Sequence, residues 1–237
     1  MNRISRRGFR HLLLFLAAPM LVLLAAVLMS RMAAIPFHLF VRDPASIAGH
    51  HPLMGVLSNL GNLLWCTCAA VCAFGSQLLA REQGVTEGVR HLRGAALLTL
   101  ILLLDDFFMV HDYLSDFYFG IKEPVIVALI CAAAVCYLWR FREAIFASEW
   151  GWLLFALACL VGSVLIDLVK DLGLAEAGPW LTHAEEPLKF LGIAAWCGYH
   201  YRLTTSLLLQ PVPQASRAQV ISDHRQQREL TTPRSAA

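Results

Sequence analysis

The sequence contains few charged residues: Asp, Glu, Lys and Arg make up 15% of its 237 residues. Soluble domains carry about a quarter. Apolar residues reach 58%, above the roughly half that is usual. These proportions exclude an intrinsically disordered chain and a collagen, and they count against a soluble α/β enzyme. The seven cysteines all lie in apolar stretches, which excludes a disulfide-rich secreted scaffold as well.

The long apolar stretches lack the alternation of apolar and polar residues that is typical of barrel strands. A bilayer core about 30 Å thick requires roughly 20 residues of apolar helix. Such helices satisfy their backbone hydrogen bonds internally, as a chain in lipid must. We therefore predict an all-α fold, a polytopic bundle of six transmembrane helices, with spans over 12–29, 54–79, 94–110, 125–138, 152–169 and 188–201.

Basic residues are distributed unevenly between the two sides of this bundle. Fourteen of the 19 Lys and Arg residues lie on the side of both termini. Loops rich in Lys and Arg face the cytoplasm, so we predict cytoplasmic termini in a bacterial-type inner (plasma) membrane. We divide the chain into a basic amino terminus (1–11), a transmembrane domain (12–209) and a disordered cytoplasmic tail (210–237). A twin-arginine export signal at Arg6 and Arg7 is an alternative interpretation of the amino terminus.

Histidine spacing does not favour a haem protein. His91 and His111 are 20 residues apart, and His183 and His200 are 17 apart. Two haems stacked across a membrane need ligand pairs about four helical turns apart on the same helices, and neither spacing fits. We expect no haem.

Acidic residues gather on the side opposite to the termini, which holds 11 of the 17. Several lie within predicted spans, where an ionised side chain costs a few kcal/mol and normally marks function. Helix rise places Asp105 about 18 Å, Lys189 about 20 Å, Asp167 about 22 Å and Asn62 about 28 Å from the cytoplasmic ends of their spans. Four spans therefore place polar groups in one layer, which predicts a single site near the exported face.

The pattern Asp105-Asp106-x-x-x-x-His111-Asp112 combines carboxylates with an imidazole. These are ligands that Zn²⁺ accepts, and a zinc-bound water ionises near pH 7 to give a nucleophile. We predict a divalent metal such as zinc, with Asp106, His111, Asp112 and His183 as ligands. The pattern is less specific than the metalloprotease motif HExxH.

Four residues are candidates for catalysis: Asp105, Asp106, Glu186 and Lys189. The carboxylates would act as a general base or help to hold the metal, and Lys189 would stabilise developing negative charge. The leading hypothesis is a metal-dependent membrane hydrolase. Its partners would be the lipid bilayer and a lipid or amphiphilic substrate, and we expect no nucleic acid.

Two other interpretations stay open. The acids could be the proton or cation sites of a transporter. Alternatively, the polar groups could be structural in a non-catalytic accessory protein. Glu185 and Glu186 precede Pro187, a position where an acid simply favours the helix dipole, and Lys189 could neutralise Glu185 within one helix. The sequence does not choose between enzyme, transporter and accessory protein, and it makes no prediction of oligomeric state.

Overall fold

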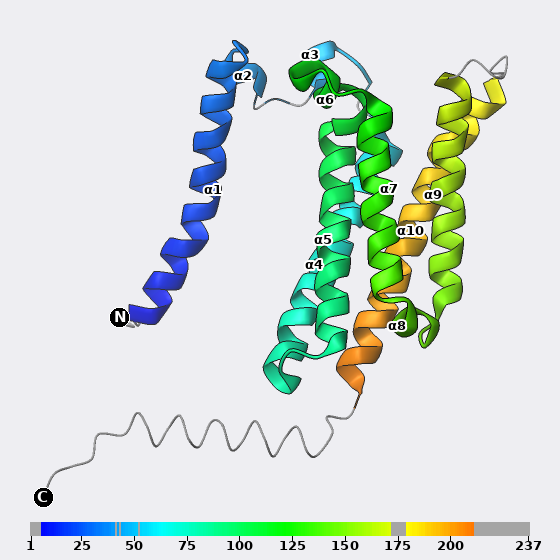
Figure 1. Ribbon diagram of the computed structural model, residues 1–237. Coiled ribbons are helices and arrows are strands. Elements are labelled where there is room, and N and C mark those ends of the chain that lie inside the picture. The colour runs from blue at the N-terminus through cyan, green and yellow to red at the C-terminus, as the bar shows by residue number, and fades with distance from the viewer. Residues whose placement is uncertain (1–5, 41, 43, 52, 172–178, 211–237) are drawn as a thin grey trace, which may run out of the picture. The chain divides into compact units, whose positions relative to one another are not determined.

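The computed structural model describes residues 6–40, 42, 44–51, 53–171 and 179–210, and within them the side chains of all but 6–15, 18, 170–171 and 179–183. Every regular element in these ranges is helical, which confirms the predicted all-α class (Figure 1). The chain divides into two compact units, Met1–Gly55 and Val56–Ala237.

The first unit is one long helix followed by two short ones. Helix α1 covers Arg6–Met32 and includes the first predicted span, while α2 (Phe37–Phe40) and α3 (Pro44–Ala48) lie in the connection after it. The hydroxyl of Ser30 donates a hydrogen bond of 2.7 Å to the carbonyl of Ile35. This contact helps the chain to turn directly after α1.

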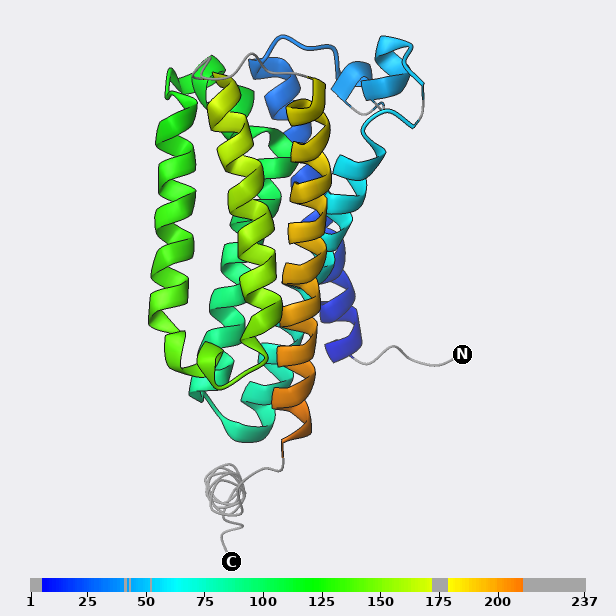
Figure 2. The same cartoon turned by 90° about the vertical axis from the view of Figure 1, so that its right-hand side faces the viewer.

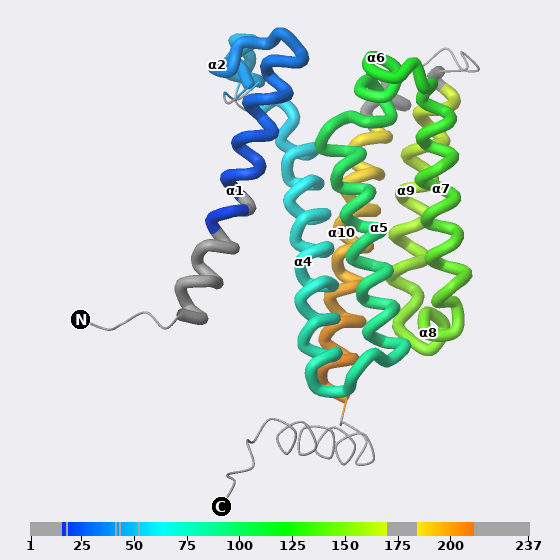
Figure 3. The backbone as a smooth tube through the Cα atoms, turned by 60° about the vertical axis from the view of Figure 1, so that its left-hand side comes forward, coloured from blue at the N-terminus to red at the C-terminus, as the bar shows by residue number. Residues whose placement is uncertain are grey.

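In its described residues, the second unit has five long helices, which run along one another (Figures 2 and 3). Helix α10 packs against α9 and α4, and α4 packs against α5. Three short helical segments lie between the long ones. The elements are α4 (Val56–Gln83), α5 (Glu87–Phe108), η1 (Val110–Leu114), α6 (Ser115–Phe119), α7 (Glu123–Arg140), α8 (Arg142–Phe146), α9 (Trp150–Asp171) and α10 (Pro179–Leu209).

Several helices have the length and composition of membrane spans. Helices α4, α7 and α9 are long and apolar enough to cross a bilayer, and α5 with its bent continuation makes a fourth if that pair counts as one span. Large apolar side chains on α7 and α9 face outward, among them Leu129 and Val135, each 62% exposed. These features indicate a membrane protein. Four of the six predicted spans each fall within one long helix. The second begins two residues before α4, and the third runs past the end of α5 at Phe108 into η1. The number and orientation of the spans stay predictions.

Local sequence explains where several helices begin and end. Thr86 has an extended backbone and its hydroxyl accepts a hydrogen bond of 3.4 Å from the Val89 amide, so it caps α5. Helix α6 ends at Phe119, and Gly120 caps it with a φ of 64° that suits a residue without Cβ. Helix α7 then begins at Glu123, with Pro124 in its first turn, as the Glu-Pro pair indicates.

The helices approach most closely around α10. A Cβ added to Gly192 would lie 2.7 Å from Leu160 Cγ and 3.1 Å from the Leu160 backbone nitrogen of α9. Small residues at such contacts allow helices to pack closely in membranes. Buried residues of α4, α5, α7, α9 and α10 form one core that includes Trp65, Leu92, Tyr137, Ala156 and Trp196.

Helix α10 corrects one interpretation of the sequence. It begins at Pro179, well before the predicted span, and Pro187 lies inside it. Glu185 and Glu186 therefore lie in the body of the helix. The interpretation that they stabilise the dipole at its amino terminus is wrong for both. A proline within a helix loses one backbone hydrogen bond, a loss that transmembrane helices tolerate because neighbouring groups satisfy the freed carbonyl.

Candidate functional site

The site is built around an interruption in the helix that carries most of the predicted acids. Helix α5 ends at Phe108, and Met109 adopts the left-handed conformation with φ 49° and ψ 48°. The π-helical turn η1 and then α6 continue from it, at an angle of 61° to α5. The Met109 amide donates to the carbonyl of Asp105, and the Leu114 amide donates to the Met109 carbonyl at 3.1 Å. π-Helical turns of this kind occur often at functional sites.

Asp105 bridges this interruption. Its Oδ1 accepts a hydrogen bond of 3.1 Å from the backbone amide of His111, and its Oδ2 lies 2.7 Å from His111 Nδ1. The Asp105 side chain is 13% exposed and that of His111 is 19% exposed. One carboxylate therefore fixes both the backbone and the imidazole ring on the far side of the break.

A second carboxylate completes the environment of the ring. Asp112 Oδ1 lies 3.1 Å from His111 Nε2. Both ring nitrogens thus face carboxylate oxygens, an arrangement that a doubly protonated, cationic ring satisfies fully because both of its nitrogens donate. We call Asp105, His111 and Asp112 the carboxylate–imidazole cluster.

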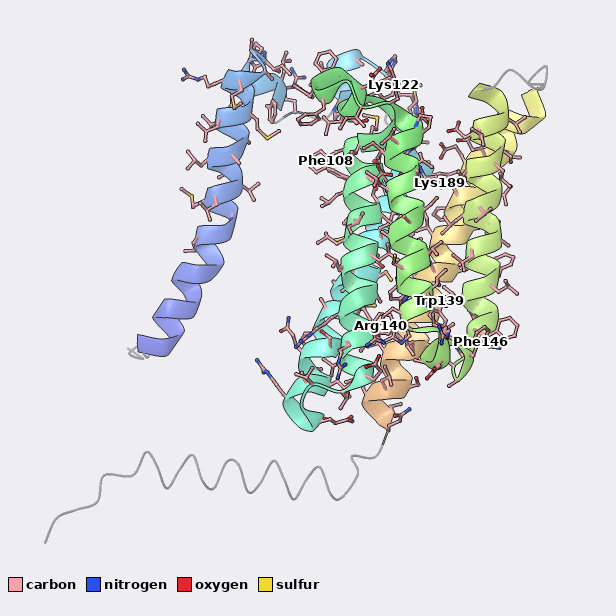
Figure 4. The ribbon with its side chains drawn as sticks, viewed as in Figure 1. Phe108, Lys122, Trp139, Arg140, Phe146 and Lys189 are labelled. Atoms are coloured by element: carbon pink, nitrogen blue, oxygen red, sulfur yellow. The ribbon has the colours of Figure 1, made fainter. Side chains whose placement is uncertain are left out.

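Asp106, the immediate neighbour of Asp105, has a different partner. Its Oδ1 lies 2.5 Å from Lys189 Nζ, so the pair joins α5 to α10. The Asp106 side chain is 10% exposed and that of Lys189 is 32% exposed. Opposite charges in a medium of low dielectric constant attract strongly, and pairing offsets part of the cost of removing them from water. Figure 4 shows Lys189 on α10, in the half of the bundle that also holds Lys122.

A small pocket lies beside this ion pair. Its volume is about 10 Å³, room for roughly one water molecule. Ser58 of α4, Asp106 of α5 and both Glu186 and Lys189 of α10 line it. One turn further along α4, the buried Oδ1 of Asn62 has no hydrogen-bond partner among the residues that the structure describes. Three helices therefore contribute polar groups here, within the layer that helix rise predicts.

The predicted metal ligands are divided between two contacts. His111 uses both ring nitrogens for Asp105 and Asp112, while Asp106 contacts Lys189. In the part of the chain that the structure describes, no three His, Cys, Asp or Glu side chains are arranged to hold a metal ion. His183 belongs to α10, but its side chain lies outside the described residues. The four residues predicted for catalysis do come from the two helices α5 and α10, and three of them line or flank the small pocket.

Sequence reasoning missed a second polar network, nearer the other end of the bundle. His200 Nδ1 lies 2.9 Å from the carbonyl of Trp196, so this nitrogen donates and Nε2 accepts from the Tyr137 hydroxyl at 3.1 Å. Trp196 Nε1 donates to Thr99 Oγ1 at 3.0 Å. The spacing of Trp196 and His200, one helical turn apart, was a signal available in the sequence. Their partners come from other helices, so spacing along the chain does not reveal them.

Fold and site together define the class: an all-helical protein with candidate membrane spans and ionisable groups buried between α5 and α10. Residues 12–203 match a family model described as a domain of unknown function, DUF8692, and the chain belongs to that family. No curated protein and no solved structure matches the chain.

Proposed function

We propose that this protein is a proton- or cation-coupled membrane transport protein, and that the coupling ion binds at the carboxylate–imidazole cluster and the adjoining Asp106–Lys189 pair. The observation that carries the proposal is the contact of Asp105 with His111 across the break at Met109. Interrupted transmembrane helices are typical of ion sites in secondary transporters, because their free backbone groups and side chains can face a cavity. Chains of Asp, Glu and His in spans are typical of proton and cation pathways.

The charge of the site favours a cation. Asp105, Asp106 and Asp112 supply three carboxylates, and His111 and Lys189 supply at most two positive charges. The remaining negative charge can be neutralised by a bound cation or by a proton, since both reduce the cost of an ionised carboxylate away from water. Asp112, with 41% of its side chain exposed, is the member of the cluster through which an ion would enter.

The proposal includes a location and an orientation. We place the protein in a bacterial-type inner membrane with six spans and both termini cytoplasmic, which leaves the site near the exported face. The excess of Lys and Arg on the side of the termini supports this orientation.

Charge displacement on a solid-supported membrane tests the proposal without knowledge of the substrate. Proteoliposomes that carry the full chain are exposed to a jump in pH or in Na⁺ concentration, and the transient current is recorded. We expect Asp105→Asn to reduce the displaced charge by about ten-fold or more, because it removes a charge-assisted contact worth at least about 1.4 kcal/mol.

Asp116→Asn is the matched control, since Asp116 is half exposed and pairs with Lys122 rather than with the cluster. It should leave the current unchanged. A current that is equal in the parent protein, in Asp105→Asn and in empty liposomes contradicts ion coupling at this site.

A metal-dependent hydrolase acting on a lipid or amphiphile is the second candidate function. The pocket that brings together Ser58, Glu186 and Lys189 beside Asp106 favours it, because a hydroxyl, carboxylates and an amine in one place can supply a nucleophile, a base and a stabilising charge. Elemental analysis of the purified protein tests this function. Stoichiometric zinc that disappears in Asp106→Asn supports the hydrolase, and protein without bound metal counts against it.

A further inference from the structure

A second pocket lies at the end of the bundle opposite to the carboxylate–imidazole cluster. It has a volume of about 530 Å³, which is in the range of small-molecule sites. The amino-terminal end of α5, the connection from α8 to α9 and the last turns of α10 enclose it. Figure 4 shows Arg140 and Phe146 at this end. We call it the arginine-end pocket; the residues used below are Glu87, His91, Ser148, Glu149, Tyr199 and Arg202.

Two carboxylates and one arginine of the pocket lining take part in ion pairs: Glu149, Glu87 and Arg202. Arg202 binds Glu149 through two hydrogen bonds of 2.5 and 2.6 Å, and this contact lowers the pKa of the Glu149 carboxyl from its usual value. On the other side, Glu87 binds Arg140 at 2.5 Å and Arg90 at 3.3 Å. Both signs of charge are therefore available to a ligand that enters, and all five side chains are about half exposed.

Further inside, hydrogen-bond acceptors outnumber donors. The Ser148 hydroxyl donates to the carbonyl of Ile145 at 2.7 Å, so the Tyr199 hydroxyl, 3.0 Å away, donates to Ser148. Both oxygens then offer only lone pairs to a ligand. His91 is 1% exposed, and its Nε2 has no hydrogen-bond partner among the described residues. A buried polar atom without a partner is costly. In the tautomer that carries its proton on Nδ1, His91 Nε2 accepts, and a ligand N–H group would then supply the missing donor.

An aromatic groove continues from this pocket along the outside of α9. It has a volume of about 640 Å³ and shares Ser148, Glu149 and Trp152 with the arginine-end pocket. Trp150, Trp152 and Phe155 line it and are each about half exposed. Helix α9 is a candidate span, and with α9 across a bilayer the groove at its first turns would lie where lipid chains meet their head groups, a position that suits tryptophan.

We propose that the arginine-end pocket binds the head group of a phospholipid that carries both a phosphate and a primary ammonium group, as phosphatidylethanolamine does. The ammonium group donates to the acceptors inside the pocket and to the Glu87 or Glu149 carboxylate. The phosphate lies at the opening, against the guanidinium of Arg202, where charge-assisted hydrogen bonds are strong. The acyl chains follow the aromatic groove. This proposal does not depend on the function assigned to the carboxylate–imidazole cluster.

Native mass spectrometry of the full chain in detergent tests the proposal, with lipids of identical acyl chains. We expect phosphatidylethanolamine to bind at least about ten-fold more tightly than phosphatidylcholine, which has no ammonium N–H, and more tightly than phosphatidylglycerol, which has no ammonium. Equal binding of the three lipids overturns the proposal, as does preference for phosphatidylglycerol.

The double exchange Glu149→Arg with Arg202→Glu keeps a surface ion pair but reverses its direction. It should weaken phosphatidylethanolamine binding by about ten-fold, as should the single change Arg202→Gln. The matched control exchanges Asp116 and Lys122, an exposed pair at the opposite end, and should leave binding unchanged. Unchanged binding in both arginine-end variants, with melting temperatures near that of the parent, overturns the proposal.

Soluble phosphoethanolamine distinguishes a membrane lipid from a free ligand. Because the groove contributes apolar contacts only to acyl chains, the soluble head group should compete with the lipid only at concentrations at least about a hundred-fold higher. Competition at equal concentration overturns the assignment to a lipid.

Discussion

The Asp106 carboxylate is nearly buried and its charge is balanced by Lys189 from another helix. Removing one member of such a pair leaves an uncompensated charge, which costs more than removing both. The contact between Asp106 and Lys189 could not be predicted from the sequence. Helix rise places both residues at similar depth, but the packing of α10 against α4 and α5, which decides their contact, depends on side chains such as Trp196 and Thr99 that lie far apart in the chain.

We predict strong coupling between these two side chains. Lys189→Met alone should destabilise the protein by about 3–5 kcal/mol, because Asp106 is left buried and unpaired, and Asp106→Asn together with Lys189→Met should recover most of that loss. Equilibrium unfolding of the parent, the single variants Asp106→Asn and Lys189→Met, and the double variant in mixed detergent measures the coupling. Additive effects of the two substitutions would contradict a direct ion pair.

Among the elements, the interrupted segment α5–η1–α6 departs most from the sequence prediction. A continuous helix would place Asp105 and Asp112 on one face with His111 to the side. The left-handed backbone of Met109 instead turns His111 back towards Asp105, between the two carboxylates. The residues of the cluster could be predicted because charges in apolar stretches are rare. Their arrangement could not be predicted, because a methionine in the sequence does not indicate a positive φ.

Backbone strain at Met109 can be measured directly. A left-handed conformation costs a residue with a side chain roughly 1–2 kcal/mol, and glycine avoids this cost. Since half of the Met109 side chain is exposed, Met109→Gly should raise the free energy of unfolding by about 1 kcal/mol, while the β-branched Met109→Val should lower it. Thermal unfolding in detergent compares the three proteins. A glycine variant less stable than the parent would show that Met109 lies in a continuous helix, where glycine is unfavourable.

At the scale of the whole molecule, charge is sorted between the two ends of the bundle. The nearly neutral net charge of +2 conceals this arrangement: among the described residues of the second unit, Arg140 and Arg202 lie at one end, and Asp105, Asp106 and Asp112 lie towards the other. Length and hydropathy alone identify the long helices, and each predicted span overlaps one of them. The predicted span 94–110 nevertheless crosses the break at Met109, which the sequence did not predict. The number of helices that cross the membrane is harder to predict, because α10 combines charged residues such as Lys189 and Arg202 with apolar ones.

Reporter fusions test the predicted orientation. Alkaline phosphatase fused after Leu209 should be inactive and green fluorescent protein at the same position should be fluorescent, since both results indicate a cytoplasmic carboxyl terminus. Phosphatase inserted after Gly120, between α6 and α7, should be active. An active phosphatase at both positions contradicts an odd number of crossings between them, and with it the six-span topology.

The contact of Asp105 across the break has a mechanical consequence. One carboxylate holds the His111 amide with one oxygen and the imidazole with the other. It therefore fixes the segment beyond Met109 to the end of α5. A cation that attracted this carboxylate would release the turn and the ring together. Occupancy of the site would then change the angle between α5 and α6.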